Sequence, residues 1–531
     1  MFVVLLLINM IVITDMKIIE ISYGKLKGSE MDGGFGHTFY GFKKIPFATP
    51  PLGSLRFQKL RPPASWNHTL DATEYGPACP QNTSDSKRVF TNQNEDCMHI
   101  NIFTSQFCLN TKKCPVVFYV HGGYLNYGSP IMFNDTYIYK NFVANDIVLV
   151  LPAYRLGILA HFVVEDQTVA PVNLAVYDIM QSMELMHNEI SKFGGDNSQV
   201  TLFGHSYGGG LVIDMIMSDM IDPHGKYFHK LISMSGPVIF YPLDLKLNNT
   251  KKMVARLNCS APNDIKEKDK YTMECMQKID VHTLINTQHD LERDKVYFSS
   301  LTRALPLFQG NTDLEFISRK VRKIPFMTGS TISELNMDDY YKLANFMDFK
   351  NHKEINERIW SDYDKKLIPG RRLWLDGILV IVSARMIVDK FSNDGAPTYL
   401  YRYSYPKHNG HGDDLRFLLG ARKYDDDENE LILSDIYPKY FVDFIKYGVP
   451  SSDWEKYNDT TQSYYEINVN VTTGLMPHLE NHYEHEVLDY FYKDLRKVDE
   501  EISLEKKMMK KGMGHRWSIM NIVLFIVVCL I

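Results

Sequence analysis

Apolar residues follow two patterns along the chain, and the patterns predict different elements. Three short runs are apolar without alternation, PVVFYV (115–120), DIVLVLPAY (146–154) and VTLFG (200–204). Such runs are typical of strands that are covered on both faces of a parallel sheet. Before the third run, apolar residues recur at steps of three or four, which predicts one buried helix face: Val176, Ile179, Met180, Met183, Met186 and Ile190. The order of strand, helix and strand predicts an α/β fold with a large, mostly parallel central sheet and helices on both faces.

The third apolar run leads directly into a Gly-x-Ser-x-Gly motif, in which Gly204 and Gly208 flank Ser206. The residues after it, SYGGGLVIDMIM, predict a turn that enters a second helix. Between a strand and a helix, such a serine occupies a strained turn, and a Cβ at either glycine would collide with the adjoining elements. The motif therefore predicts that Ser206 is a nucleophile. The alternative is a glycine-rich turn without chemistry.

Composition and charge exclude some classes of protein. The chain has 531 residues, of which 45% are hydrophobic and 23% charged, as in folded globular proteins. Its 58 basic and 64 acidic residues give a net charge of −6, so no basic excess points to a nucleic-acid partner. The length by itself predicts two or more domains.

Several features indicate the secretory pathway. Residues 1–14, MFVVLLLINMIVIT, form a short apolar segment typical of a cleaved signal peptide, although Met16 could also be the start. Six of the seven cysteines fall into close pairs, which favours three local disulfides over the many other pairings: Cys79 with Cys97, Cys108 with Cys114, and Cys259 with Cys275. Asn-x-Ser/Thr sequons occur at Asn67, Asn82, Asn134, Asn248, Asn258, Asn458 and Asn470.

The C-terminal residues 506–531 combine a basic linker with an apolar end. Residues 517–531, WSIMNIVLFIVVCLI, are preceded by a cluster of cations: Lys506, Lys507, Lys510, Lys511 and Arg516. This arrangement favours some form of C-terminal membrane attachment. A transmembrane helix and a lipid-anchor signal both remain open, because the segment is short for the first and its small-residue site is poorly formed for the second.

Longer stretches of the chain resemble the type-B carboxylesterase family of α/β-hydrolases, which includes the cholinesterases. The resemblance is carried by FKKIPFATPPLGSLRFQKLRPP (42–63), NEDCMHINIF (94–103), PVVFYVHGG (115–123), AYRLGILAHF (153–162), FGGDNSQVTLFGHSYGGG (193–210) and MSGP (234–237). It extends from about Gly24 to about Trp454. Since the family has one large domain, the resemblance implies a single catalytic domain, here residues 15–505, in place of the two suggested by length.

The resemblance implies a Ser-Glu-His triad, in the chain order that this fold uses. The nucleophile is Ser206. The acid is Glu334, which follows Gly329 with four residues between, although Leu335 replaces the family's usual glycine. The histidine is His411 in HGDDL (411–415), with His408 as the weaker alternative. No metal or cofactor is implied.

Two other groups of polar residues have alternative interpretations. His408, His411, Asp413 and Asp414 could hold a metal on composition alone. His478, His482 and His485 resemble a helical row of ligands, but they lack the glutamate of a zinc hydrolase and are interpreted as surface histidines. Ser235, in MSGP, matches a family serine that supports the triad.

The predicted oxyanion hole departs from the family pattern. Family members usually have His-Gly-Gly-Gly, whereas this chain has His121, Gly122, Gly123 and then Tyr124. The expected donors are the backbone N–H groups of Gly123, Tyr124 and Tyr207. Tyr124 must then adopt a conformation that glycine reaches freely, and Tyr207 stands where the family usually has alanine. We expect the two rings to narrow the substrate pocket. His205 and Ile179 also replace an acidic residue and a glutamine that are usual in the family.

The sequence therefore predicts a serine carboxylesterase that hydrolyses small to medium neutral esters. The segment between Cys79 and Cys97 has no tryptophan, the residue that stacks on choline in cholinesterases, so choline esters are not expected as substrates. One alternative is a non-catalytic adhesion or interaction protein, a type that the family also includes. A lipase acting on longer-chain esters is the other.

Overall fold

The computed structural model describes residues 16–34, 37–82, 90–238, 240–310, 315, 318–334, 344, 347–368, 375–422 and 426–510. The predicted signal peptide (1–14) and the apolar end of the chain (517–531) lie outside the described residues. Within the described ranges, no helix is both long enough and apolar enough to cross a membrane.

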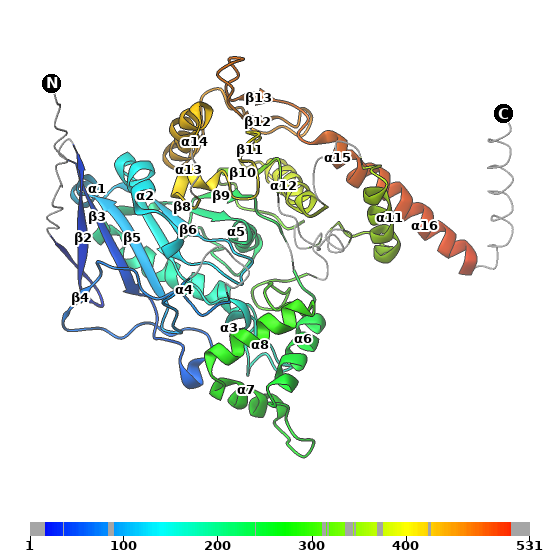
Figure 1. Ribbon diagram of the computed structural model, residues 1–531, viewed down its shortest axis with the longest axis horizontal. Helices are drawn as coiled ribbons and strands as arrows, with labels where there is room; N and C mark the ends of the chain where they lie inside the picture. The colour runs from blue at the N-terminus through cyan, green and yellow to red at the C-terminus, as the bar shows by residue number, and fades with distance from the viewer. Residues whose placement is uncertain are drawn as a thin grey trace, which may run out of the picture.

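A mixed sheet of 13 strands, counted over the described residues, runs through the molecule (Figure 1). Its order is β1-β2-β3-β5-β7-β6-β8-β9-β10-β11-β12-β13, and β4 pairs with β2. Pairing is parallel from β7 to β12 and antiparallel at both ends, except that β4 pairs with β2 in parallel. The strands are β1 (Lys17–Ile21), β2 (Gly24–Gly34), β3 (His37–Pro46), β4 (Thr69–Asp71), β5 (His99–Ser105), β6 (Cys114–Val120), β7 (Val148–Pro152), β8 (Gly195–His205), β9 (Lys230–Met234), β10 (Phe326–Thr331), β11 (Thr398–Tyr403), β12 (Tyr464–Ile467) and β13 (His478–Glu480).

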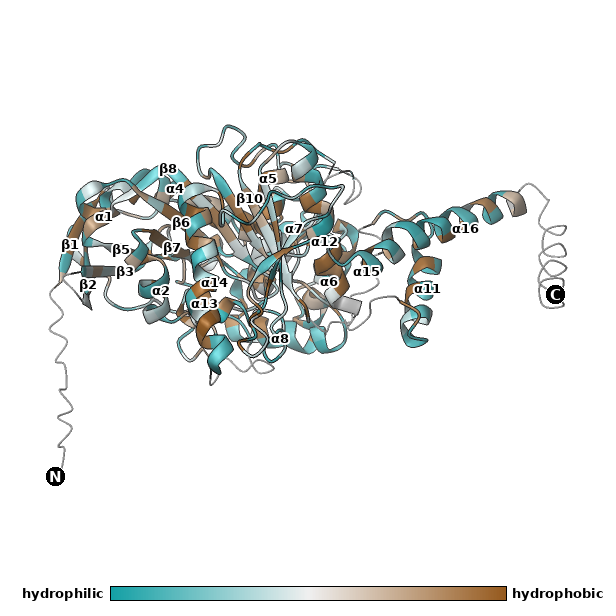
Figure 2. Cartoon of the chain, turned by 90° about the horizontal axis from the view of Figure 1, so that it is seen from above, coloured by the Kyte–Doolittle hydropathy of each residue, from teal (hydrophilic) through white to brown (hydrophobic). Residues whose placement is uncertain are grey.

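Helices cover both faces of this sheet (Figure 1). They are α1 (Gln106–Thr111), α2 (Asp135–Asn141), α3 (Gly157–His161), α4 (Leu174–Glu189), α5 (Tyr207–Met217), α6 (Leu243–Arg256), α7 (Lys268–Lys278), α8 (Val281–Arg293), α11 (His352–Asp364), α12 (Leu375–Asn393), α13 (Leu415–Leu419), α14 (Glu428–Tyr447), α15 (His485–Asp489) and α16 (Leu495–Lys510). The last of these, α16, extends away from the body of the molecule (Figure 2).

The two faces of the sheet contribute to separate hydrophobic clusters. Along β6, Val116 and Phe118 join the cluster that includes residues of α4 and α5. Val117 and Tyr119 join the cluster that includes residues of α2 and α14. Because successive side chains of a strand point to opposite faces, burial of both sets requires helices on both sides. This explains why the central strands are apolar without alternation, and it confirms the predicted α/β fold.

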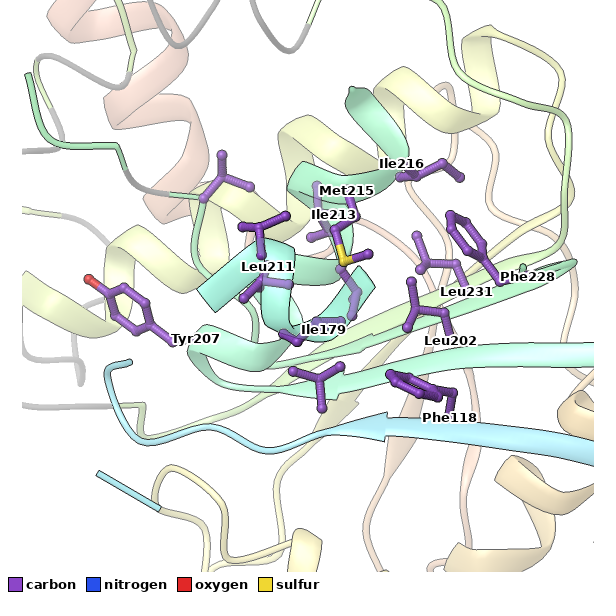
Figure 3. Packing of buried hydrophobic residues seen from close by; sticks show 14 of the residues in the cluster. Phe118, Ile179, Leu202, Tyr207, Leu211, Ile213, Met215, Ile216, Phe228 and Leu231 are labelled. Carbon is purple, nitrogen blue, oxygen red and sulfur yellow. The ribbon is translucent and has the colours of Figure 1, made fainter. Parts of the chain in front are cut away.

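The elements expected from the sequence are present with small shifts in their ends. The three apolar runs form β6, β7 and β8, and β8 begins five residues before the predicted run. The predicted helix over residues 176–190 is α4, and the helix expected after Ser206 is α5. Ile179 is fully buried in the cluster between α4, α5 and the sheet (Figure 3).

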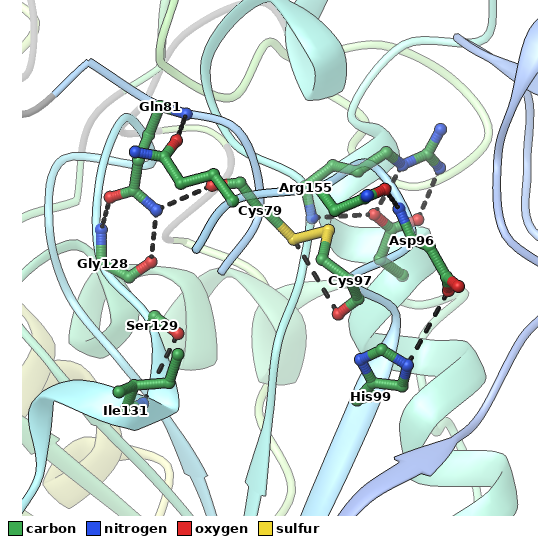
Figure 4. The surroundings of a disulfide bond; sticks show 12 residues. Cys79, Gln81, Asp96, Cys97, His99, Gly128, Ser129, Ile131 and Arg155 are labelled. Carbon is green, nitrogen blue, oxygen red and sulfur yellow. Dashed lines mark hydrogen bonds and ion pairs between the residues drawn. A yellow bond between two sulfur atoms is a disulfide. The ribbon is translucent and has the colours of Figure 1, made fainter. Parts of the chain in front are cut away.

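Three disulfides join cysteines that are close in the sequence. They are Cys79–Cys97, Cys108–Cys114 and Cys259–Cys275, the pairs favoured by the sequence. The first lies beside the segment that carries Gln81 (Figure 4). The third joins the residues after α6 to α7, within a helical cap made of α6, α7 and α8 on one side of the sheet (Figure 1).

Candidate active site

The turn between β8 and α5 presents Ser206 in a conformation that is rare for a serine. Its φ of 58° and ψ of −132° lie outside the regions that L-residues ordinarily occupy. The flanking glycines permit the turn: a Cβ at Gly204 would lie 2.1 Å from the Gly208 carbonyl oxygen, and one at Gly208 would lie 2.3 Å from the Val120 carbonyl oxygen. A backbone bond from Ser206 N–H to the Met234 carbonyl, 2.8 Å long, ties the turn to β9. The sequence-based expectation about these glycines is thus met in atomic detail.

Glu334 and His411 come to Ser206 from loops that follow β10 and β11. His411 Nε2 lies 2.8 Å from Ser206 Oγ, and His411 Nδ1 is hydrogen-bonded to Glu334 Oε2. The two loops are held together by backbone pairing, with Ser333 N–H donating to the Asn409 carbonyl at 3.1 Å. Since β8, β10 and β11 run parallel, their carboxyl ends meet at one edge of the sheet, which is why residues so distant in sequence become neighbours.

The Glu334 carboxylate is buried and has a partner on each oxygen. While one oxygen faces His411, the other accepts hydrogen bonds from Ser235 Oγ at 2.6 Å and from the Thr331 backbone N–H at 2.8 Å. Burial by itself would raise the pKa of Glu334, but the His411 imidazole and these hydrogen bonds hold that pKa below its ordinary value. The carboxyl group therefore stays ionised and keeps a fixed orientation. Ser235 has the supporting position expected from the sequence.

A cavity of about 810 Å³ opens onto Ser206 and His411. Its described lining includes Gly122, Gly123 and His205 near the serine. The His205 ring lies beside that of His411, with the two ring centroids 4.9 Å apart. The site can thus admit a molecule of moderate size directly to the Ser206 hydroxyl.

The loop after β6 lies against the Ser206 turn. A Cβ at Gly122 would lie 2.7 Å from Ser206 Cβ, so only glycine allows this approach. Tyr124 has a φ of 65° and Leu125 a φ of 53°, both in the left-handed region. Tyr124 therefore adopts the conformation expected of it from the sequence, one that a glycine would reach at lower cost.

The rings of Tyr124 and Tyr207 pack on each other, with centroids 4.6 Å apart and an interplanar angle of 32°. Tyr207 is buried at the start of α5 and belongs to the hydrophobic cluster that also includes Leu211 (Figure 3). Neither ring is among the described side chains that line the cavity. The expectation that the two rings narrow this cavity is therefore not met, because they pack on each other, with Tyr207 in the apolar core and Tyr124 partly buried against it.

The other polar residues singled out in the sequence have different partners. His408 Nδ1 is hydrogen-bonded to Glu430, whereas His411 faces Glu334. Asp413 is paired with Arg422, and Asp414 accepts a hydrogen bond from Tyr437 Oη at 2.9 Å. The four side chains that could hold a metal on composition alone, His408, His411, Asp413 and Asp414, are thus directed to four separate groups.

The histidines near the end of the chain do not form one helical row. His478 lies in β13, His482 in a turn and His485 at the start of α15. His482 and His485 are exposed, and His478 is partly exposed. They occupy the surface, as the sequence predicts.

Sequence reasoning missed the residues that the helical cap contributes to the cavity. Ile285, Gln288, His289 and Glu292 line it from α8. One signal was available: Gln288 stands at helical spacing among the buried Leu284, Ile285 and Leu291, and a polar residue in an apolar helix stripe calls for a specific partner. Spacing alone could not show which group Gln288 contacts, nor that this face of the helix lines a cavity.

Comparison with known proteins shows the family to which the chain belongs. The sequence profile of the carboxylesterase family matches residues 15–372 and 364–491. The chain belongs to the carboxylesterase family. Rabbit (Oryctolagus cuniculus) liver carboxylesterase 1 is 26% identical over 519 residues, which covers 85% of this chain and 89% of that protein. Human (Homo sapiens) carboxylesterase 5A is 28% identical over 489 residues, which covers 82% of each.

Solved structures of two esterases share the fold. A thermophilic PNB esterase superposes with a TM-score of 0.73 at 22% identity, covering 88% of this chain and 98% of that one. The juvenile hormone esterase of Manduca sexta, solved with OTFP covalently attached, superposes with a TM-score of 0.74 at 18% identity, covering 92% and 100%. At these identities the likeness shows the fold alone, an α/β architecture that this chain shares with both proteins.

Proposed function

We propose that this carboxylesterase-family chain is a serine esterase, which hydrolyses carboxylic esters through an acyl-enzyme on Ser206. The observation that carries the proposal is the continuous hydrogen-bonded line from Ser206 through His411 to the buried Glu334, at the floor of a cavity. A serine hydroxyl is a weak nucleophile until a base accepts its proton. This line supplies that base and the group that orients it.

The reaction would proceed in two halves. His411 Nε2 accepts the Ser206 Oγ proton as Oγ bonds to the ester carbonyl carbon, and it then returns the proton to the departing alcohol. A water molecule next attacks the acyl-enzyme, giving its proton to His411, and the carboxylic acid leaves as Ser206 regains the proton. Glu334 stabilises the imidazolium that forms in each half without itself taking the proton.

Backbone N–H groups of Gly123, Tyr124 and Tyr207 are proposed as the donors to the oxyanion. Two features support them: the loop after β6 lies against Ser206, and Tyr207 begins α5, whose N-terminus favours negative charge. The donors are main-chain groups, so tyrosine side chains at two of these positions are compatible with the role. No metal or cofactor has a part in this mechanism.

The test is hydrolysis of p-nitrophenyl acetate and butyrate by the purified protein, together with labelling by an organophosphate. We expect wild type to show both, and Ser206→Ala to lose labelling and to lose about 10⁶-fold in kcat, as nucleophile removal does in other serine hydrolases. A folded wild-type protein with neither activity nor labelling would instead support the alternative class, a non-catalytic interaction protein. Longer acyl chains in the same assay would separate an esterase from a lipase.

We also propose that the chain enters the secretory pathway. The three disulfides support this, since such bonds persist in oxidising compartments, and the sequons are compatible with it. The signal peptide at 1–14, the catalytic domain at 15–505 and membrane attachment through 506–531 are parts of the same proposal.

A further inference from the structure

Three polar side chains join α8 to the loop that follows β6. Gln288 Nε2 donates to Asn126 Oδ1 at 2.5 Å and to Glu292 Oε1 at 2.8 Å. Asn126 Nδ2 donates in turn to Glu292 Oε2 at 3.0 Å. Gln288 is only 4% exposed, and all three residues line the cavity above Ser206. They form a closed network between the helical cap and the active-site loop.

The orientations of the two side-chain amides in this network are determined by the groups that they contact. The Ile158 backbone N–H donates to Gln288 Oε1 at 2.7 Å. Because that N–H can only donate, the amide oxygen of Gln288 must face it, and the amide NH₂ must face Asn126 and Glu292. Because the Gln288 NH₂ donates to the Asn126 side-chain oxygen, the Asn126 NH₂ must point toward Glu292. A single arrangement of the two amides satisfies every group.

This network holds the end of a backbone turn that is unfavourable by itself. Tyr124 and Leu125 are consecutive left-handed residues, and neither is glycine. Such a conformation persists only where the surroundings impose it. The turn is closed by Asn126 N–H, which donates to the Gly123 carbonyl at 2.9 Å, and Gly157 N–H donates to the Leu125 carbonyl at 2.8 Å. The helix α8 contacts this turn through the Asn126 side chain.

We propose that Gln288 and Glu292 are positioning residues for ester hydrolysis. By holding Asn126, they keep residues 123–125 in the conformation that directs the N–H groups of Gly123 and Tyr124 toward the oxyanion. The inference rests on the proposed function of Ser206. It makes the helical cap a part of the catalytic machinery as well as a wall of the cavity.

The expected kinetic consequence is specific. Oxyanion donors act mainly when charge develops in the transition state, so a loosened turn lowers kcat more than it changes KM. A thionoester carries sulfur in place of the carbonyl oxygen, and sulfur is a weaker hydrogen-bond acceptor. The ratio of kcat/KM for an ester to that for its thionoester therefore reports on the oxyanion donors, whereas a general loss of folded enzyme lowers both equally.

The experiment compares the full-length wild type with Gln288→Ala, Glu292→Gln and a control, Asn286→Ala, whose side chain is exposed on the same helix. The substrates are p-nitrophenyl acetate and p-nitrophenyl thionoacetate. We expect Gln288→Ala to lower kcat for the ester by roughly 10- to 100-fold, with KM changed less than about threefold. The ratio of kcat/KM for the ester to that for the thionoester should fall together with kcat. In Glu292→Gln, kcat for the ester and this ratio should also fall, but by less than in Gln288→Ala. Asn286→Ala should match wild type in both quantities.

Each outcome decides between the explanations. Equal losses on both substrates, or variants that match wild type, would overturn the positioning role while leaving Ser206 catalysis intact. If Gln288→Ala does not fold, Glu292→Gln decides alone, since it keeps the side chain's size and an unchanged ratio would refute the inference. An inactive wild type would count against the proposed function itself.

Discussion

At the residue scale, the site depends on the partners of each side chain as much as on its identity. Glu334 lies in the loop after β10, and its carboxylate is oriented because Ser235 and the Thr331 N–H occupy one oxygen and leave the other for His411. A buried carboxylate without such donors would favour its neutral form. Ser235 thus contributes to the site by holding the Glu334 carboxylate in its orientation.

A second buried carboxyl group lies close to this triad and behaves in the opposite way. Asp414 is fully buried, and burial, together with the nearby Glu334 carboxylate, raises its pKa to about 8. The folded state therefore keeps this proton at pH values where the unfolded chain, with a pKa near 3.8, has released it. The contribution of protonated Asp414 to the free energy of unfolding is complete at pH values below its pKa in the unfolded chain. This contribution is lost as the pH rises toward its pKa in the folded state.

We predict that Asp414→Asn, which is neutral at every pH, escapes this loss. Its free energy of unfolding relative to wild type should rise between pH 4 and 8 by up to about 1.4 kcal/mol per pH unit. Urea unfolding of both proteins at pH 5 and pH 7.5 measures the change. A difference between the two proteins that stays constant with pH would contradict the prediction.

At the scale of elements, the β8–α5 turn shows how tightly a strand and a helix must approach to present a nucleophile. Neither glycine of the turn has room for a methyl group, because a Cβ at Gly204 would meet the Gly208 carbonyl oxygen and a Cβ at Gly208 would meet that of Val120. The positive φ of Ser206 is the result of that approach. Strain at the turn is balanced by the burial of α5 against β8 and β9.

We predict that Gly204→Ala destabilises the protein by roughly 3 kcal/mol, because its Cβ would lie 2.1 Å from a backbone oxygen that cannot move without α5. The matched control is Gly474→Ala, whose φ is 74° but whose Cβ would have no heavy atom within 4 Å. That variant should lose only about 1 kcal/mol, the cost of left-handed backbone. Urea unfolding measures both, and equal losses would show that the contact is not limiting.

At the scale of the whole molecule, the sheet and the helical cap each contribute one part of the site. The edge of the parallel sheet brings Ser206, Glu334 and His411 together, and the cap supplies the opposite wall through α8. A small hydrophobic cluster joins Leu284 and Leu291 of the cap to Ile158 and Leu159 of α3, and the Cys259–Cys275 disulfide lies within the cap. The cap is therefore attached to the rest of the molecule by apolar packing and by polar contacts such as that of Gln288 with Asn126.

We predict that removing the cap disulfide with Cys259→Ser and Cys275→Ser lowers the free energy of unfolding by about 3 kcal/mol, because it frees a loop with a sequence separation of 16. Removing Cys108–Cys114, with a separation of 6, should cost less, since a shorter loop has less entropy to regain. Urea unfolding of the two double-serine variants in parallel gives the comparison. The reverse order would contradict the loop-entropy explanation.

Local patterns were sufficient to identify the central strands, the helix α4 and the nucleophile turn. Their information is carried by neighbours in the chain: uninterrupted apolar runs, a three-to-four-residue period, and glycines on both sides of Ser206. The resemblance to a known family then supplied Glu334 and His411, which lie too far from Ser206 for spacing to relate them. Sequence alone therefore determined the fold class and named three residues that the structure brings together.

The tertiary structure decided which side chains surround those residues. Three features depend on contacts between segments far apart in the chain. They are the packing of Tyr124 on Tyr207, the absence of both rings from the described wall of the cavity, and the network of Asn126, Gln288 and Glu292. Periodicity shows that a helix has an inner face but not what that face meets. For this protein the pattern along the chain determined which elements form, and their packing determined the shape and polarity of the cavity above Ser206.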